Sequence, residues 1–163
     1  MSDALTGLQT HAAFPSVELG DAGCRAVAFD VAGLIWVNDQ LGFEQGHATL
    51  KAVAAALSAL VTSVGGRLFR YAGDEFLWIL PDDCSRDLCE LAELALRATR
   101  ELKLPYRACA SARSHVALNA ALLRLAPGDL TDPPRLRGRV ADCIYAAKLV
   151  HGADHDLIAG EVR

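Results

Sequence analysis

Residues 68–80 read LFRYAGDEFLWIL, two apolar runs separated by a short polar connection. The runs LFRY and FLWIL are rich in the aromatic and branched side chains that favour β-strands. In the connection AGDE, Gly73 supplies the backbone freedom that a tight turn between strands needs. The segment therefore predicts a β-hairpin that carries two carboxylates, Asp74 and Glu75, at its tip.

A third strand is predicted upstream, at residues 24–31. Its sequence, CRAVAFDV, is a short apolar run in which Asp30 is the only charge after Arg25, a pattern typical of a buried strand that carries a carboxylate near its end. Between this strand and the hairpin, the apolar residues of segment 44–64 recur every three or four positions, and two glycines end the pattern. This spacing predicts a helix with one face on a core.

The rest of the chain alternates in the same way. The patterns predict a helix at residues 86–103, a strand pair, a loop, a helix and a short closing strand; the last four elements lie at 106–112 with 116–125, 127–134, 135–150 and 155–159. The order β-α-β-β-α-β-β-α-β indicates an α+β fold, a central antiparallel-rich sheet flanked by helices. At 163 residues the chain is predicted to be a single domain, 1–163.

The composition of the chain narrows the classes of partner that it can be expected to bind. Sixteen Lys and Arg against twenty Asp and Glu give a formal net charge of −4, so the chain lacks the basic field with which nucleic-acid binders displace counterions. Its longest uncharged stretch, residues 52–66, is shorter than the roughly 20 residues needed to cross a bilayer. We therefore expect no nucleic-acid partner and no membrane, and, without a recognisable signal segment at the start, a cytoplasmic location.

Asp30 and the pair Asp74–Glu75 are the candidate reactive groups. They lie 44 residues apart in sequence, but neighbouring central strands of the predicted sheet could bring them side by side. Magnesium suits such a pair, because it takes one or two carboxylates and completes its shell with waters and substrate phosphates. The competing interpretation is that Asp74 is a solvated turn residue, since Asp and Gly are common in turns.

Four segments, in order, resemble the GGDEF domain of the diguanylate cyclase family. The resemblance covers nearly the whole chain and lies in DALTGL with a later Phe (3–8 and 14), FD through ND with LG and G (29–46), RYAGDEF (70–76) and AD with Y, A and K (141–148). A single such segment would be weak evidence, whereas four in register are strong.

The resemblance implies a ferredoxin-like, nucleotidyl-cyclase palm and the Mg²⁺-dependent (or Mn²⁺-dependent) condensation of two GTP, or another nucleoside triphosphate, to a cyclic dinucleotide in cyclic di-GMP signalling. It implies metal ligands at Asp30 and Asp74, with Glu75 as an active-site acid beside them. It further implies that Asn38 contacts the guanine edge, that Ala72 and Gly73 form the turn beside the nucleotide, and that Arg70 and Lys148 contact phosphates.

Several positions depart from the family pattern. Ala72 replaces the first Gly of the signature, which puts a methyl group where the backbone approaches a nucleotide or where φ could be positive. Ile35 replaces a phosphate-facing Lys, and the Gly-Arg that follows Lys148 in the family is missing. His47 stands at the position of the guanine-reading Asp, and a neutral imidazole offers one acceptor where the carboxylate offers two.

The inhibitory product site of the family is also missing, because residues 63–66 read SVGG where an R-x-x-D motif would stand. Two hypotheses follow. The first is a cyclase of weakened or altered activity, which would need a homodimer because each protomer holds one triphosphate. The second is a catalytically degenerate domain that serves as a nucleotide-binding or protein-interaction signalling module.

Overall fold

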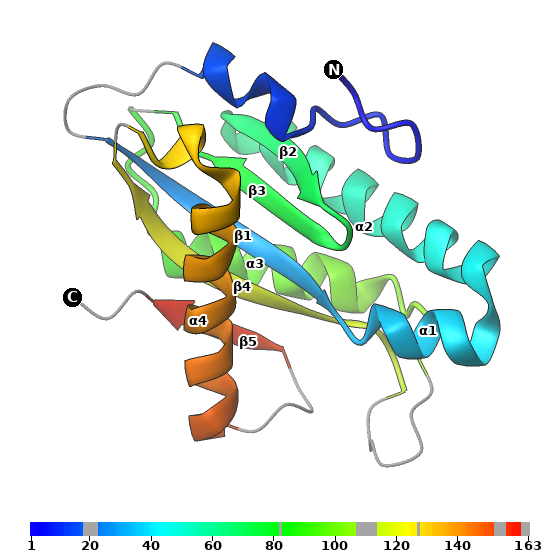
Figure 1. Cartoon of the computed structure of the whole chain (residues 1–163). Coiled ribbons are helices and arrows are strands. Elements are labelled where there is room, and N and C mark those ends of the chain that lie inside the picture. Colours follow the sequence, from blue (N-terminus) through cyan, green and yellow to red (C-terminus); the bar gives the residue numbers. More distant parts are fainter. Residues whose placement is uncertain (18–22, 82, 107–113, 127, 152–155, 161–163) are drawn as a thin grey trace.

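The computed structural model describes residues 1–17, 23–81, 83–106, 114–126, 128–151 and 156–160. Within these ranges a five-stranded sheet has the order β2-β3-β1-β4-β5 (Figure 1). All its pairs are antiparallel except β4 with β5, which confirms an antiparallel-rich sheet. The strands are β1 Cys24–Ala32, β2 Arg67–Ala72, β3 Glu75–Ile79, β4 Ala117–Leu125 and β5 Leu157–Gly160.

Helices cover both faces of this sheet. Helices α2 and α3 pack on one face, over a core that contains Phe29 and Trp78. Helix α4 covers the other face, together with a 3-10 turn near the N-terminus, over a core that contains Phe69 and Leu77 (Figure 1). The helices are α1 Leu34–Leu41, α2 Phe43–Val64, α3 Leu88–Glu101 and α4 Pro133–His151, with 3-10 turns at His11–Ser16 and Asp129–Thr131. The α+β fold predicted from the sequence is confirmed.

The hairpin turn is tighter than the sequence predicted. β2 extends to Ala72 and β3 begins at Glu75, so Gly73 and Asp74 alone form the connection, where a four-residue link was expected. A register shift lies between Arg70 and Ala72. Such an irregularity in a strand pair bends the strand and re-aims its side chains.

Two helical boundaries also differ from the predictions. Helix α4 begins at Pro133, inside the segment 127–134 predicted as a loop. Proline is compatible with the first helical turn, where the missing N–H has no intrahelical partner, and Asp132 Oδ1 accepts the backbone N–H of Arg135 at 3.1 Å. Helix α1 was not predicted, because its eight residues between Gly33 and Gly42 are too few to show a helical period.

The predicted strand at 106–112 lies almost wholly outside the described residues. Tyr106, its one described member, is not in a strand, although the adjacent Pro105 forms an isolated bridge with His115. The predicted closing strand at 155–159 is described from residue 156 onward and corresponds to β5.

Within the described ranges, one helix is long and apolar enough to cross a membrane. Helix α2 has 22 residues, and an 18-residue stretch within it has a mean hydropathy of 1.4, so this criterion finds a candidate where the count of uncharged residues found none. One such helix is weak evidence, because the core helix of a packed domain has the same composition. In this structure α2 buries Val53, Ala54 and Leu57 in the core beneath the sheet.

Candidate active site

A row of polar side chains crosses three strands at one end of the sheet. Asp30 on β1 is the register partner of Glu75 on β3 and of Asn119 on β4. The backbone N–H of Val31 also donates to the carbonyl oxygen of Asp74 at 3.1 Å, which ties the hairpin turn to β1. Because side chains alternate along a strand, Asp30 projects to the face that carries Ala26 and Ala28, which is the face under α4. The fold thus brings the predicted acids together.

Asn119 is a site residue that the sequence analysis missed. Its amide Nδ2 donates to Asp30 Oδ2 at 3.0 Å, and its side chain is 1% exposed. The amide oxygen, Oδ1, is buried and has no hydrogen-bond partner in the described part of the chain. The signal was present, because a lone Asn inside the apolar strand sequence ALNAALLRL calls for a polar partner.

Arg137 is the second missed residue. Its Nε lies 2.8 Å from Glu75 Oε2, and the Glu75 side chain is 11% exposed while that of Arg137 is 57% exposed. The segment RLRGR holds three arginines. Only the placement of α4 on the sheet decides that Arg137, rather than Arg135 or Arg139, meets the acidic row.

Two acids at this site, Asp74 and Glu75, have raised pKa values. Burial raises the pKa of the Asp74 carboxyl, and the negative charge of Asp30 raises it further. Burial also raises the pKa of Glu75, and the opposing effect of Arg137 does not cancel it. Burial and the charge of Glu75 together raise the pKa of the Tyr71 phenol. Such clustered, raised values are typical of functional sites.

The donor set fits a hard divalent cation. Asp30 and Asp74 offer carboxylate oxygens, and the unpartnered Oδ1 of Asn119 lies beside Asp30. Among the described residues no group of three His, Cys, Asp or Glu side chains forms a ready-made metal cage. Magnesium does not require one, because it is held by one or two carboxylates, with waters and substrate phosphates as its other ligands.

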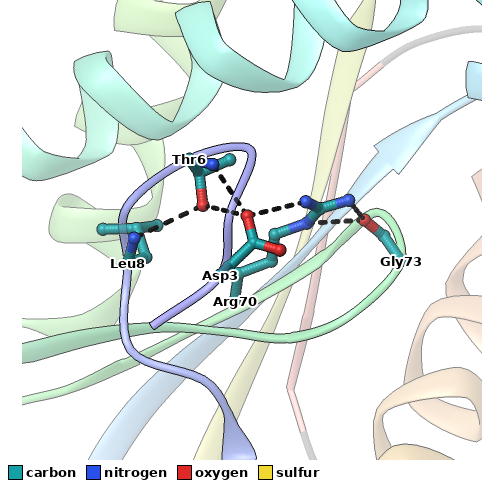
Figure 2. Close-up of polar contacts among 5 residues, drawn as sticks. All are labelled: Asp3, Thr6, Leu8, Arg70 and Gly73. Carbon is teal, nitrogen blue, oxygen red and sulfur yellow. Dashed lines mark hydrogen bonds and ion pairs between the residues drawn. The ribbon is translucent and has the colours of Figure 1, made fainter. Parts of the chain in front are cut away.

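Arg70 belongs to a different contact on the same turn. Its Nη1 donates to Asp3 Oδ2 at 2.9 Å, and its Nε donates to the carbonyl oxygen of Gly73 at 2.8 Å (Figure 2). Asp3 also accepts the backbone N–H and the hydroxyl of Thr6, each at 2.7 Å. Burial raises the pKa of Asp3, but the hydrogen bonds from Thr6 and Arg70 outweigh it and hold the value below normal. Arg70 therefore joins the N-terminal loop to the hairpin turn at Gly73 and Asp74. Its contact with a phosphate stays a prediction.

The predicted base-binding residues lie at the junction of α1 and α2. A Cβ built at Gly46 would lie 1.9 Å from Asn38 Oδ1, so the amide of Asn38 rests directly against α2 at Gly46. Gly46 is thus required by packing. His47, the next residue, is exposed. The structure therefore brings Asn38 and His47 to one place, and their contact with a base stays a prediction.

The remaining predicted site residues lie in two places, Ala72 and Gly73 at the hairpin and Lys148 on α4. Ala72 pairs with Glu75 in the sheet, and its backbone φ is not positive, so the methyl group causes no backbone strain. Gly73 likewise has no positive φ, and a Cβ there would contact nothing within 4 Å. Lys148 is half-buried on α4, about 16 Å along the helix axis from Arg137. No ion pair joins Lys148 to the acidic row within the described residues, and its role also stays a prediction.

The fold and the acidic row together define an α+β domain of the nucleotidyl-cyclase type. A family model described as "Diguanylate cyclase, GGDEF domain" matches residues 1–153. The chain belongs to this family, and it is a GGDEF domain homologous to diguanylate cyclases. A search of curated proteins found no match.

Solved structures of GGDEF domains share the fold. The GGDEF domain of DgcB from Caulobacter crescentus, in complex with c-di-GMP, aligns with a TM-score of 0.68 at 19% identity and covers 98% of this chain and 94% of that chain. The GGDEF domain of PA1120 (YfiN or TpbB) from Pseudomonas aeruginosa aligns at 0.67 with 22% identity and covers 97% and 99%.

A longer protein aligns as well. The diguanylate cyclase SiaD from Pseudomonas aeruginosa, in complex with its activator SiaC, aligns with a TM-score of 0.66 at 22% identity. The match covers 97% of this chain and 61% of that chain, so this chain spans less than two thirds of SiaD. At these identities the likeness shows a common fold. Cyclases of the family generally depend on a divalent metal.

Proposed function

We propose that this GGDEF domain binds a nucleoside triphosphate, most simply GTP, with Mg²⁺ or Mn²⁺ at Asp30 and Asp74, and condenses two such molecules to a cyclic dinucleotide with weakened activity. The observation that supports this best is the cross-strand placement of Asp30 beside Glu75 and the turn at Asp74. In this proposal the domain acts in the cytoplasm, where nucleoside triphosphates are available.

Each residue of the row has a part in this proposal. When bound, the cation would neutralise the triphosphate and lower the pKa of the attacking 3′-hydroxyl. Asn119 orients Asp30 through its 3.0 Å hydrogen bond. Glu75, whose pKa is raised by burial, lies beside Asp30 as a further acid of the site. Since one domain binds one triphosphate, ring closure requires two domains face to face, as a homodimer.

A second function, nucleotide or partner binding without chemistry, is favoured by a specific observation. Arg137 already pairs with Glu75 and so supplies a positive charge at the acidic row without any metal. His47 also lacks the second acceptor that a carboxylate would offer to guanine. This degenerate domain would bind a nucleotide and transmit a signal, but release no cyclic product.

One experiment separates the two functions. The protein is incubated with each nucleoside triphosphate and with Mg²⁺ or Mn²⁺, and products are identified by mass spectrometry, with Asp74→Asn as the test variant and Glu93→Gln, an exposed acid on α3, as the charge-matched control. The cyclase proposal expects a cyclic dinucleotide from wild type and Glu93→Gln and about a tenfold or greater loss in Asp74→Asn. Metal-dependent nucleotide binding without product would support the degenerate domain. Nucleotide binding that ignores both metal and Asp74→Asn would overturn the metal assignment.

The base is tested separately, at His47. We expect weak GTP binding by the wild-type domain, with Kd in the high-micromolar range or weaker, about −5 kcal/mol. His47→Asp restores a two-oxygen acceptor, so it should tighten GTP binding about fivefold and leave ATP binding unchanged. Calorimetry that shows tight GTP binding by wild type, with ATP excluded, would contradict this view of the base pocket.

A further inference from the structure

A pocket lies on the α4 face, beside the acidic row. Its volume is about 970 Å³, and it lies between the end of β2 and the first turns of α4. Its lining includes Tyr71, Ala72, Pro133, Pro134, Arg137 and Ala141. This volume is at the upper end of the range that small-molecule sites occupy. Of its lining residues, only Arg137 has a part in the functions proposed above.

Two of the lining residues carry hydrogen-bond donors, Tyr71 and Arg137. The Tyr71 hydroxyl is buried and has no hydrogen-bond partner among the described residues, and the side chain as a whole is 5% exposed. A buried hydroxyl without a partner is costly, so it calls for an acceptor from outside the chain. The other group is the Arg137 guanidinium, which retains N–H donors beyond the Nε that meets Glu75. His11 also lines the pocket, but its ring Nδ1 lies 3.2 Å from the carbonyl oxygen of Tyr71.

The lining selects one class of ligand. A guanidinium and a hydroxyl both donate hydrogen bonds, so they match a single carboxylate. A triphosphate would need more cations than Arg137 supplies. The prolines and alanines make most of this lining apolar, which matches an aromatic ring system better than a sugar.

We propose that this pocket binds a small aromatic monocarboxylate, whose carboxylate accepts hydrogen bonds from Arg137 and Tyr71 and competes with Glu75 for the guanidinium. The competition follows from the geometry. Arg137 stands between the pocket and the acidic row, and its side chain is 57% exposed and so able to turn toward either. A ligand in the pocket is then coupled to the charge of the active-site carboxylates through one shared residue.

The test uses 2-naphthoate as the probe, without nucleotide or divalent cation, so its result does not depend on the proposed cyclase function. Isothermal titration calorimetry measures the Kd for the full chain and its variants. Arg137→Met should weaken binding about tenfold or more, and Tyr71→Phe about fivefold, because each removes a donor to the carboxylate. Arg135→Met, the matched control on an exposed residue of the same helix, should change the Kd less than about twofold.

The variant Glu75→Gln gives the decisive measurement. Glu75→Gln frees Arg137, so it should tighten naphthoate binding about threefold or more. Asp74→Asn removes a neighbouring charge without releasing Arg137, so its effect should be smaller. The neutral analogue 2-naphthalenemethanol should bind more weakly than the carboxylate and ignore Arg137→Met and Glu75→Gln. Absence of naphthoate binding, equal binding of the alcohol, or binding unaffected by Arg137→Met would overturn the proposal. Thermal melting of each variant shows that it is folded.

Discussion

Two ion pairs flank the hairpin turn at Gly73 and Asp74, and the surroundings of the two pairs differ. On one side Arg70 joins Asp3, with side chains 13% and 22% exposed, while Thr6 also donates to Asp3 and Arg70 also donates to the carbonyl oxygen of Gly73. On the other side Arg137 joins Glu75, but Asp74 and Asp30 crowd the same place and their charges oppose one another.

This difference is visible in the acids themselves. The pKa of Asp3 is lowered, because hydrogen bonds to its charged form outweigh its burial. The pKa values of Asp74 and Glu75 are raised, because burial and like charge outweigh the help from arginine. A satisfied carboxylate stabilises the fold, whereas an under-compensated one is available to a cation, a proton or a ligand.

The largest effect is expected from Arg70. Arg70→Ala removes the contacts to Asp3 and to the Gly73 carbonyl and leaves a partly buried carboxylate behind, so the free energy of unfolding should fall by roughly 2 kcal/mol. Urea denaturation measures it. Arg97→Ala, on an exposed residue of α3, should cost less than about 0.5 kcal/mol. A loss that small for Arg70→Ala would mean that the two sides of the turn do not differ as described.

The next effect concerns Asp3 and its pH dependence. A lowered folded-state pKa contributes stability above the unfolded value, near 3.8, and loses it as the pH falls through the folded value. Asp3→Asn should therefore cost on the order of 1 kcal/mol at pH 7, and the cost should vanish at a pH well below 3.8. Urea titrations at both pH values measure the difference. A cost that is the same at both would show that the charge of Asp3 is not what stabilises the loop.

Asp74 should respond with the opposite sign. Its folded-state pKa is raised above 3.8, so the ionised form opposes folding as the pH rises through the folded value, and the penalty is absent at lower pH. Asp74→Asn should stabilise the metal-free protein at pH 7 by on the order of 0.5 kcal/mol and weaken Mn²⁺ binding. Thermal melts give the first quantity and Mn²⁺ electron paramagnetic resonance the second. Destabilisation at pH 7 would argue for a structural turn residue instead.

The smallest effect is expected from Arg137. The Arg137 side chain is 57% exposed and that of Glu75 is 11% exposed, so solvent screens this pair from one side, and a Gln at position 137 still offers an N–H donor to Glu75. Arg137→Gln should therefore change the free energy of unfolding by less than about 0.5 kcal/mol, although it removes the counter-charge of Glu75. Urea denaturation of Arg137→Gln and Arg70→Ala under the same conditions compares their free energies of unfolding directly. A loss as large as that of Arg70→Ala would make Arg137 a structural residue.

Much of the sheet could be predicted, because β-strands reveal themselves locally. The alternation and apolar runs around Asp30, Asp74 and Glu75 predicted β1, β2 and β3 within a residue or two. The length of the turn could not be predicted, since the shift between Arg70 and Ala72 depends on how β2 pairs with β3. Helix α1 was not predicted for a different reason, because a helix this short between two glycines shows no detectable period of apolar residues.

The sequence by itself determined the antiparallel-rich sheet, the identity of its acidic residues and the resemblance to one family, because strand and helix periods and motif spacings are local properties of the chain. Tertiary structure decided which of those residues meet. Asp30 and Asn119 lie 89 positions apart and become neighbours through the β1–β4 register. Arg137 reaches Glu75 because Leu136 and Val140 seat α4 on the sheet at one height and rotation, and no local pattern encodes where along a sheet a helix will rest.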